Sequence, residues 1–393
     1  MHNNSVMLHT LAISGYRSLK DVVVPLGQSN VITGPNGSGK SSLYRSLRLL
    51  ADAADGRLIP SLAREGGLSS TLWAGPETLS REMQTGEVPV QGTLRKKPVA
   101  LRLGFNGDAF SYTIELGLPA PSSSVFALDP VIKRECLWHG PSMRPKELCL
   151  DRRGNSLRCR SEGGKWQELD LTLTPYASVL SEYADPVVTP ELILVRDMIR
   201  AWRFYDHLRT DAHAPARHAP VGTYTPVLAD DGNDLASALQ TIREIGFAQE
   251  LERTIDDAFP GSQLGIESHH GRLEVTLRQP GMLRPLRTSE LSDGTLRYLL
   301  LAAALLTPRP PTLMILNEPE TSLHPSLLPA LGRMISRYAS EQQVVVVTHA
   351  ATLIESLNEF DQCLHHRLTK RLGATEIEGV DPIETMGWKW PPR

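Results

Sequence analysis

The stretch GPNGSGKS at positions 34–41 constrains the fold of this chain more than any other feature. It has the form G-x-x-x-x-G-K-[S/T] of a phosphate-binding loop, whose glycines let backbone N–H groups turn inward around phosphate oxygens. The apolar pair Val31-Ile32 precedes it and a helical pattern follows it, which is the strand–loop–helix context that the motif requires. The residues that we expect to contact a nucleotide are Gly34, Asn36, Gly37, Ser38, Gly39, Lys40, Ser41 and Ser42.

Two side chains of this loop carry the expected chemistry. Lys40 is expected to reach the β- and γ-phosphates, and the Ser41 hydroxyl is expected to bind Mg²⁺. The motif therefore predicts a nucleoside triphosphate near residue 40, but it does not say what the protein does with it.

The bulk composition is that of an ordinary globular protein. The 393 residues are 41% hydrophobic and 22% charged, enough for two domains or for one large domain with an inserted one. A formal net charge of −3 excludes a basic character of the whole chain, so contact with nucleic acid would need a local patch. The four cysteines form no C-x-x-C pair, and the longest apolar stretch, 298–306, is shorter than the ~20 residues that cross a bilayer. Because the N-terminus has no signal-peptide pattern, we expect a cytoplasmic protein with free thiols and no membrane contact.

Hydrophobic periodicity predicts an α/β protein. Alternation predicts strands within 8–33, and four apolar residues between 43 and 54 fall on one face of a helix that starts at Lys40. Further strands are expected at 99–105 and 112–116, which form a hairpin, and near 135–138, 147–150, 156–160, 202–205 and 273–277. Helices are expected at 191–201, 233–245 and 247–259, and the final third alternates between helix 295–306, strand 312–316, helix 326–339, strand 344–347 and a helix from 350. Alternation of helices with continuous apolar strands predicts a parallel sheet covered on both faces.

The two ends of the chain are therefore expected to fold together. We assign 1–55 and 285–393 to a nucleotide-binding core, and 56–284 to an inserted α+β subdomain of hairpins and helices. The insertion has no sustained heptads, so it predicts no extended coiled coil. Too few residues follow the last expected helix for an appended nuclease domain, and we expect a stand-alone head.

Four short motifs follow the phosphate loop in a fixed order. They are LSDGT at 291–295 before a helix, LMILNE at 313–318, TSLHP at 321–325, and Thr348-His349 after an apolar strand. Together with Tyr16-Arg17-Ser18-Leu19 near the start, this order resembles the ABC-type ATPases, and more closely their RecF/SMC/OLD-like branch. The resemblance covers 1–55 and 285–360 well and the middle poorly. It implies a P-loop NTPase of the ABC-ATPase-like head type, in which a mixed sheet is flanked by helices.

The resemblance also implies ATP and Mg²⁺ as cofactors and a homodimer as the active form. In the family, the signature serine and glycine, here Ser292 and Gly294, contact the γ-phosphate held by the partner subunit, so that ATP lies between two heads. A serine at a helix N-terminus is also an ordinary N-cap residue, and this alternative stays open. Ser322 and His324 match the family loop that crosses the dimer interface.

The residues expected to act on ATP follow two buried strands. By resemblance, Glu318 is the general base, and a carboxylate just past a strand is well placed to polarise an attacking water. Asn317 stands where the family usually has Asp, so its amide can bind a metal-bound water but brings no negative charge. Glu320 could compensate for this loss, but we expect it to be a solvated turn residue. By resemblance His349 is the switch histidine near the γ-phosphate, whereas a lone histidine after a strand is often an ordinary surface residue.

Other candidates are less constrained by the sequence. Arg17 matches a family arginine near the nucleotide, and a surface charge is the alternative. Gln84 and Gln91 are candidates for the family's glutamine loop by position only. Three local basic groups could contact DNA or could be solvated surface: Arg152-Arg153, Arg158 with Arg160, and Arg200 with Arg203.

Two classes of function fit these features. The first is an ATPase that converts ATP and water to ADP and phosphate. Its two heads would close on Mg-ATP and couple closure to DNA or to a separately encoded effector or nuclease, in DNA repair or phage defence. The second is a nucleotide-gated sensor or scaffold with little or no hydrolysis, because Asn317 replaces the usual Asp.

Overall fold

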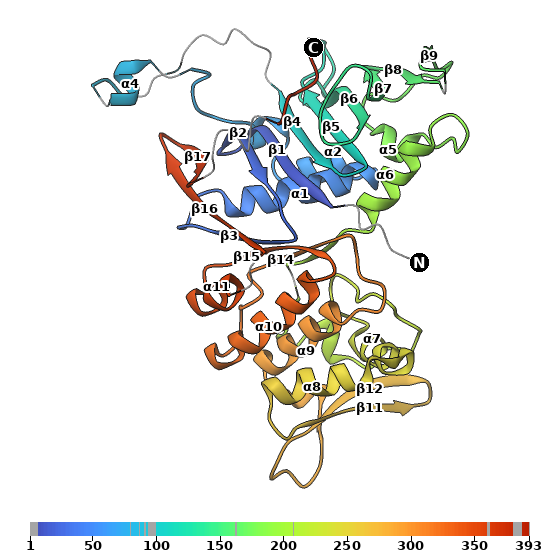
Figure 1. The fold of residues 1–393 in the computed structure, drawn as a ribbon, viewed down its shortest axis with the longest axis vertical. Helices are drawn as coiled ribbons and strands as arrows, with labels where there is room; N and C mark the ends of the chain where they lie inside the picture. Colours follow the sequence, from blue (N-terminus) through green and yellow to red (C-terminus); the bar gives the residue numbers. More distant parts are fainter. Residues whose placement is uncertain are drawn as a thin grey trace. The chain divides into compact units, whose positions relative to one another are not determined.

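The computed structural model describes residues 7–78, 80–85, 87–89, 92, 100–161, 163–206, 208–359, 362–379 and 387–392 (Figure 1). Its internal contacts group the chain into two units. The first unit comprises Met1–Gly27, Thr33–Trp202 and His366–Arg393, and the second comprises Gln28–Ile32 and Arg203–His365. The core and insertion boundaries expected from the sequence stay a prediction.

An eight-stranded antiparallel sheet forms the centre of the first unit, in the order β2-β1-β4-β5-β6-β7-β8-β9. Its strands are β1 (Leu8–Tyr16), β2 (Leu19–Pro25), β4 (Leu101–Gly107), β5 (Phe110–Gly117), β6 (Val131–His139), β7 (Leu148–Arg153), β8 (Ser156–Arg160) and β9 (Trp166–Glu168). Apolar side chains such as Leu11, Ile13, Leu103 and Phe105 alternate along the strands and are fully buried. The expected hairpin is therefore confirmed as β4–β5, although residue 99 lies outside the described residues.

Helix α1 (Lys40–Ala54) packs against β1 and β4 of this sheet (Figure 1). Leu43, Leu47 and Leu50 form its buried face, as their spacing predicts. The other helices of the unit are α2 (Leu58–Arg64), α3 (Leu68–Thr71), α4 (Arg81–Thr85), α5 (Val179–Glu182) and α6 (Pro190–Arg200).

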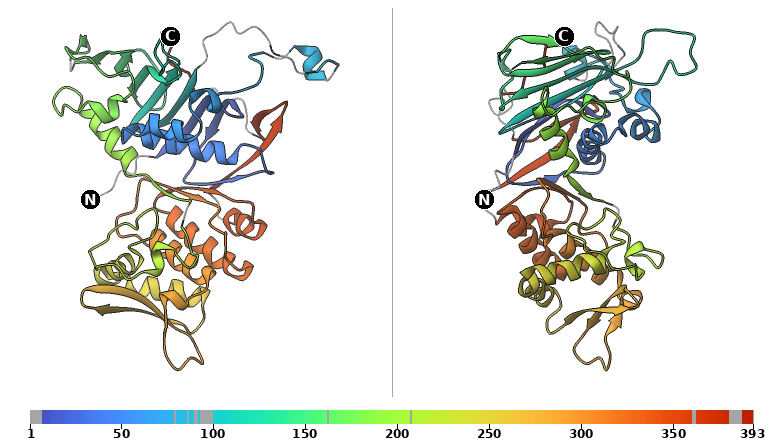
Figure 2. Two further views of the ribbon diagram at one scale, coloured as in Figure 1. Left: turned by 180° about the vertical axis from the view of Figure 1, so that it is seen from behind. Right: turned by 90° about the vertical axis from the view of Figure 1, so that its right-hand side faces the viewer.

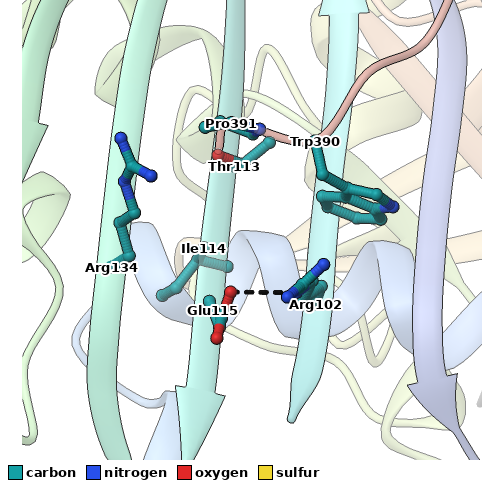
Figure 3. Close-up of a pocket in the computed structure, with 7 residues that line it drawn as sticks. All are labelled: Arg102, Thr113, Ile114, Glu115, Arg134, Trp390 and Pro391. Carbon is teal, nitrogen blue, oxygen red and sulfur yellow. Dashed lines mark ion pairs between the residues drawn. The ribbon is translucent and has the colours of Figure 1, made fainter. Parts of the chain in front are cut away.

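A short segment near the C-terminus lies on the sheet of the first unit. The Trp388 ring lies 6.0 Å from that of Trp138 and fills the space above Gly104, where a Cβ would come within 2.8 Å of it. Trp390 follows, and the guanidinium of Arg102 lies 5.8 Å from the centre of its ring. The pocket beside this segment is lined by Arg102, Thr113, Ile114, Glu115, Arg134, Trp390 and Pro391 (Figure 3). Its volume of about 10 Å³ is that of a single water, so we assign it no ligand.

The second unit contains four parallel strands in the order β10-β14-β15-β3. These are β10 (Arg203–Tyr205), β14 (Leu313–Asn317), β15 (Gln343–Val347) and β3 (Ser29–Thr33). Their side chains are almost all buried, which is the continuous apolar pattern that predicted a parallel sheet. Beyond β3 the sheet continues with β16 (Cys363–Arg371), which forms a hairpin with β17 (Ala374–Ile377).

The helices of the second unit share one hydrophobic core with this sheet. They are α7 (Leu235–Ile242), α8 (Ala248–Ala258), α9 (Asp293–Leu305), α10 (Leu328–Ala339) and α11 (Ala351–Asn358). A three-stranded sheet of β11 (Gln263–His269), β12 (Arg272–Arg278) and β13 (Leu286–Arg287) contacts α7 and α8 (Figure 2). A turn at 243–247 joins α7 to α8, and Gly246 in this turn has a φ of 104°. This conformation is accessible mainly to glycine. Gly246 therefore explains why the chain forms two helices here and not one.

The mixed α/β fold with helices flanking the sheets is confirmed, and so are the types of the expected elements. The β16–β17 hairpin was not expected from the sequence, because its polar residues alternate too weakly to indicate a strand. Within the described residues, no helix combines the length and the apolar character needed to cross a membrane.

Candidate functional site

The phosphate loop follows β3 directly and leads into α1. Gly34, Gly37 and Gly39 all have positive φ angles, of 145°, 79° and 112°. These conformations are costly for residues with a Cβ, which explains why the loop needs its glycines. The first turn of α1 contains no acidic residue, so its N-terminal N–H groups and dipole favour an anion.

The side chains of the loop also fit a phosphate. Buried Lys40 donates from Nζ to the carbonyls of Gly34 (2.6 Å) and Pro35 (3.2 Å), so its ammonium group lies within the curve of the loop. The Ser38 hydroxyl is buried and has no hydrogen-bond partner among the described residues. A buried polar atom without a partner is costly, and a ligand with acceptor oxygens would satisfy it. Ser41 is exposed at the start of α1.

The β16–β17 hairpin supports the loop from outside. Thr375 of β17 donates from Oγ1 to the carbonyl of Ser38 (2.7 Å) and lies 2.9 Å from the Ser18 hydroxyl. A Cβ on Gly39 would lie 2.4 Å from Thr375 Oγ1, and one on Gly34 would lie 2.4 Å from a carbonyl of β16. The glycines are therefore required by close packing as well as by their φ angles. No local pattern in the sequence could have indicated Thr375.

Arg17 belongs to the same unit, but another residue engages its guanidinium. Both Nη2 (2.6 Å) and Nε (3.2 Å) donate to Glu65, and the hydroxyl of Tyr16 donates to the same oxygen (2.7 Å). Burial tends to lower the pKa of Arg17, but the hydrogen bonds that Arg17 donates to Glu65 and the negative charge of that carboxylate outweigh burial, so the pKa is raised. A contact between Arg17 and the nucleotide stays a prediction, and it would compete with Glu65. For the glutamine loop, Gln91 and the side chain of Gln84 lie outside the described residues.

In the second unit, the expected catalytic residues follow the carboxyl ends of two neighbouring parallel strands. Asn317 ends β14 and is paired with Val347, the last residue of β15. The backbone N–H of Glu318 donates to the carbonyl of Val347 (2.8 Å), and that of Thr348 donates to the carbonyl of Ile32 in β3 (3.1 Å). The ends of β14, β15 and β3 therefore lie at one edge of the sheet.

At this edge, the backbone of Glu318 has a φ of 47°, which is strained for a residue other than glycine. Its side chain is exposed, and its carboxylate has no hydrogen-bond partner in the described parts of the chain. The backbone carbonyl of Glu318 accepts hydrogen bonds from Nη2 of buried Arg297 (3.2 Å) and from the N–H of Thr321 (3.1 Å). Backbone strain of this kind is retained where surrounding contacts hold it, often at functional sites.

The expectation that Glu320 is a solvated turn residue is wrong. Its side chain is only 8% exposed. Its Oε1 accepts hydrogen bonds from the Thr348 hydroxyl (2.7 Å) and from the backbone N–H of His349 (3.0 Å). Pro319 is buried too. The turn at 318–320 therefore folds back toward the end of β15, and Glu320 lies against Thr348 and His349.

The signature motif begins α9. Ser292 is the N-cap, and its hydroxyl accepts a hydrogen bond from the N–H of Thr295 (3.2 Å), so the ordinary N-cap interpretation describes its geometry. Ser292 is also exposed, and a second role toward a nucleotide stays a prediction. A Cβ on Gly294 would lie 2.8 Å from the carbonyl of Ser322, whose φ is 66°. The signature motif and the loop expected at the dimer interface are therefore in contact.

A comparison with protein families matches residues 29–355 to the family described as "AAA domain, putative AbiEii toxin, Type IV TA system". The chain belongs to this family. Membership in this AAA domain family suggests ATP binding and hydrolysis. A search of curated proteins found no match.

Three solved structures with similar folds are SMC head domains. One, a head bound to the C-winged helix domain of ScpA, has 15% identity and a TM-score of 0.48 over 96% of this chain and 99% of that chain. The head domain from Thermotoga maritima has 17% identity and a TM-score of 0.43 over 95% and 99%. A head with an extended coiled coil, bound to the C-terminal domain of ScpA and derived from Pyrococcus furiosus, has 13% identity and a TM-score of 0.47 over 97% and 98%.

Two arginines that the sequence did not single out, partly buried Arg217 and buried Arg297, hold the segments next to the signature motif and Glu318. Arg217 donates to the carbonyls of Thr288 (3.0 Å) and Leu291 (2.9 Å) and to the carboxylate of Asp293 (2.7 Å), so it fixes the segment that leads into the signature motif. Arg297 supports the carbonyl of Glu318, and burial lowers its pKa. An arginine directly before the apolar run Tyr298 to Leu305 of α9 was the signal that could have revealed the second of these.

The basic groups considered for DNA contact are largely used within the first unit. Arg152 is fully buried and pairs with Glu135, so it cannot contact DNA in this fold. Arg158 donates to Asp151 (2.6 Å), and Arg160 donates to three backbone carbonyls. Arg152 is therefore neither a DNA contact nor solvated surface, because its guanidinium satisfies internal acceptors. DNA contact by the other arginines of the three groups stays a prediction.

Proposed function

We propose that this chain is an ATP-hydrolysing head of the RecF/SMC/OLD-like branch of ABC-type ATPases, which dimerises on Mg-ATP. The observation that carries this proposal is the shared edge of three parallel strands. At this edge β3 continues into the phosphate loop, β14 continues into Glu318, and β15 continues into Thr348 and His349. β3, which pairs with β15, thus leads directly into the phosphate loop, and Glu318, which follows β14, has a carboxylate with no hydrogen-bond partner among the described residues.

The roles of the residues follow from their chemistry. Lys40 would neutralise charge on the β- and γ-phosphates, and the Ser41 hydroxyl would hold Mg²⁺, which when bound supplies further charge neutralisation. Glu318 would accept a proton from the water that attacks the γ-phosphorus, while the bond to the ADP oxygen breaks. The amide of Asn317 would hydrogen-bond a metal-bound water. Ser292 and Gly294 of a second copy would complete the site.

The test is the substitution Glu318→Gln, which keeps the shape of the side chain and removes the proton acceptor. We expect phosphate release to fall by about 10²–10⁴-fold, and we expect an ATP-bound dimer to accumulate in light scattering with Mg-ATP. Glu355→Gln, at an exposed glutamate of α11, is the matched control and should behave as wild type. Wild-type turnover by the Glu318 variant would refute the assigned base.

The alternative function, a nucleotide-gated sensor with little hydrolysis, is favoured by Asn317. An amide at this position brings no negative charge to the Mg²⁺ shell. The substitution Asn317→Asp therefore separates the two functions. A large gain in turnover from a nearly inactive wild type would favour the sensor, and robust wild-type turnover with little change would favour the ATPase.

The partner is proposed to be a separately encoded effector rather than DNA. Arg152 is buried against Glu135, and Arg158 and Arg160 donate to acceptors inside the first unit, which makes these three side chains less available to phosphates. The family description names a toxin of a type IV toxin–antitoxin system. This supports a defence role over DNA repair. Salt-dependent DNA binding in the presence of Mg-ATP would contradict this choice.

A further inference from the structure

Glu320 is a buried carboxylate whose hydrogen bonds are unevenly distributed. Its Oε1 accepts from the Thr348 hydroxyl and from the backbone N–H of His349, and it lies 3.3 Å from Nδ1 of the His349 ring. Its Oε2 is buried and has no hydrogen-bond partner among the described residues.

The surroundings keep this carboxylate close to the histidine. Glu320 is near enough to Arg297 for the two charges to interact, and the same arginine holds the carbonyl of Glu318. Two bonds to Thr348 and to the backbone of His349 fix Oε1 at the end of β15. The His349 side chain, by contrast, is 63% exposed, and Glu320 lies within ion-pair distance of its ring.

We propose that Glu320 is a positioning residue that selects the tautomer of His349. The carboxylate lies 3.3 Å from Nδ1, and its negative charge favours a proton on Nδ1, which leaves Nε2 of the neutral ring without a proton. An imidazole nitrogen without a proton accepts hydrogen bonds. His349 is therefore presented as an acceptor for the attacking water, whereas donation to the γ-phosphate would need a protonated Nε2. A carboxylate that orients a histidine in this way is a common device in enzyme sites.

This inference rests on the proposed ATPase function, but its main test needs no nucleotide. The full chain is labelled with ¹⁵N-histidine, and ring nitrogen signals are recorded at alkaline pH. His349→Gln identifies the His349 signals among those of the 12 histidines. We expect a protonated Nδ1 and an unprotonated Nε2 in wild type, and a shift toward the Nε2–H form in Glu320→Ala. A wild-type His349 that is already in the Nε2–H form would overturn the inference.

Two further variants separate positioning from folding. Glu320→Gln keeps the shape and an acceptor oxygen but removes the charge, and Glu341→Gln at an exposed glutamate is the matched control. For Glu320→Gln we expect a fall in kcat of about 10- to 100-fold, the size typical of removing a carboxylate that orients a histidine, with KM for ATP unchanged within about twofold. If KM and the unfolding midpoint change while kcat does not, Glu320 is structural and the inference fails. If wild type lacks ATPase activity while the ¹⁵N pattern is as expected, the proposed function fails and the tautomer assignment stands.

Discussion

The ion pair between Arg152 and Glu135 gives the sharpest test of how the first unit is stabilised. Both side chains have no exposed surface, and Arg152 Nη1 lies 2.8 Å from Glu135 Oε2. Arg152 also donates to the carbonyls of Ala177 (2.6 Å), Thr174 (2.5 Å) and Gly154 (2.7 Å). The substitution Arg152→Met fills similar space but leaves an ionised Glu135 without a counterion and three carbonyls without this donor.

We expect Arg152→Met to lower the free energy of unfolding by about 3–5 kcal/mol, the usual cost of leaving one buried charge unpaired. Glu135 keeps other donors, including the hydroxyl of Tyr112 and the N–H of Val179 at 3.0 Å, so complete unfolding is not expected. The double variant Arg152→Met with Glu135→Gln has no unpaired buried charge. We expect its free energy of unfolding to be about 2 kcal/mol higher than that of the single variant Arg152→Met.

The assay is urea unfolding followed by tryptophan fluorescence, which reports Trp138 in the same sheet. Arg153→Met is the matched control, because Arg153 is the next residue and is 53% exposed. It should cost less than about 1 kcal/mol. Two results would refute the reasoning: a single variant at Arg152 within about 1 kcal/mol of wild type, or a double variant as unstable as the single one.

Three further predictions test other elements. Thr375→Val removes the hydroxyl that holds the carbonyl of Ser38, so calorimetric titration should find ATP binding about fivefold weaker, for a hydrogen bond of about 1 kcal/mol; unchanged affinity would argue against support by the hairpin. Gly294→Ala forces a Cβ to 2.8 Å from the carbonyl of Ser322, at a cost of about 1–3 kcal/mol, and should abolish the ATP-dependent dimer in light scattering while leaving nucleotide binding by the monomer intact. Burial tends to raise the pKa of Asp151, but hydrogen bonds from two arginines outweigh it and hold the pKa below its ordinary value of 3.8. The ionised group therefore stabilises the fold above about pH 4, and the difference in unfolding free energy between wild type and Asp151→Asn should shrink as the pH falls below that value.

Elements with strong local signals could be predicted from the sequence. The phosphate loop, α1 and the apolar strands β14 and β15 carry their periodicity and glycines within a few residues, so their types follow from local rules. The position of Glu318 after β14 follows from the same rules.

Contacts between distant residues could not be predicted in this way. Thr375 supports the loop from more than 300 positions away, and Arg217 reaches the signature segment from a stretch without periodicity. Glu320 was misread because the sequence Glu-Pro-Glu indicates a turn, and turns are usually solvated. Its burial depends on Thr348 and His349, which only the folded sheet brings close.

The pairing of β3 with β15 sets a time at which the nascent chain can become functional. Residues 29–32 pair with residues 344–347, so β3 leaves the ribosome long before its neighbour has been made. At translation rates of about 5–20 residues per second, this delay is roughly 15–60 s. During that interval the phosphate loop follows a strand with no parallel partner on this side, and β3 presents an unsatisfied edge. Synthesis that stops before β15 should therefore yield a chain prone to aggregation, a natural client for chaperones.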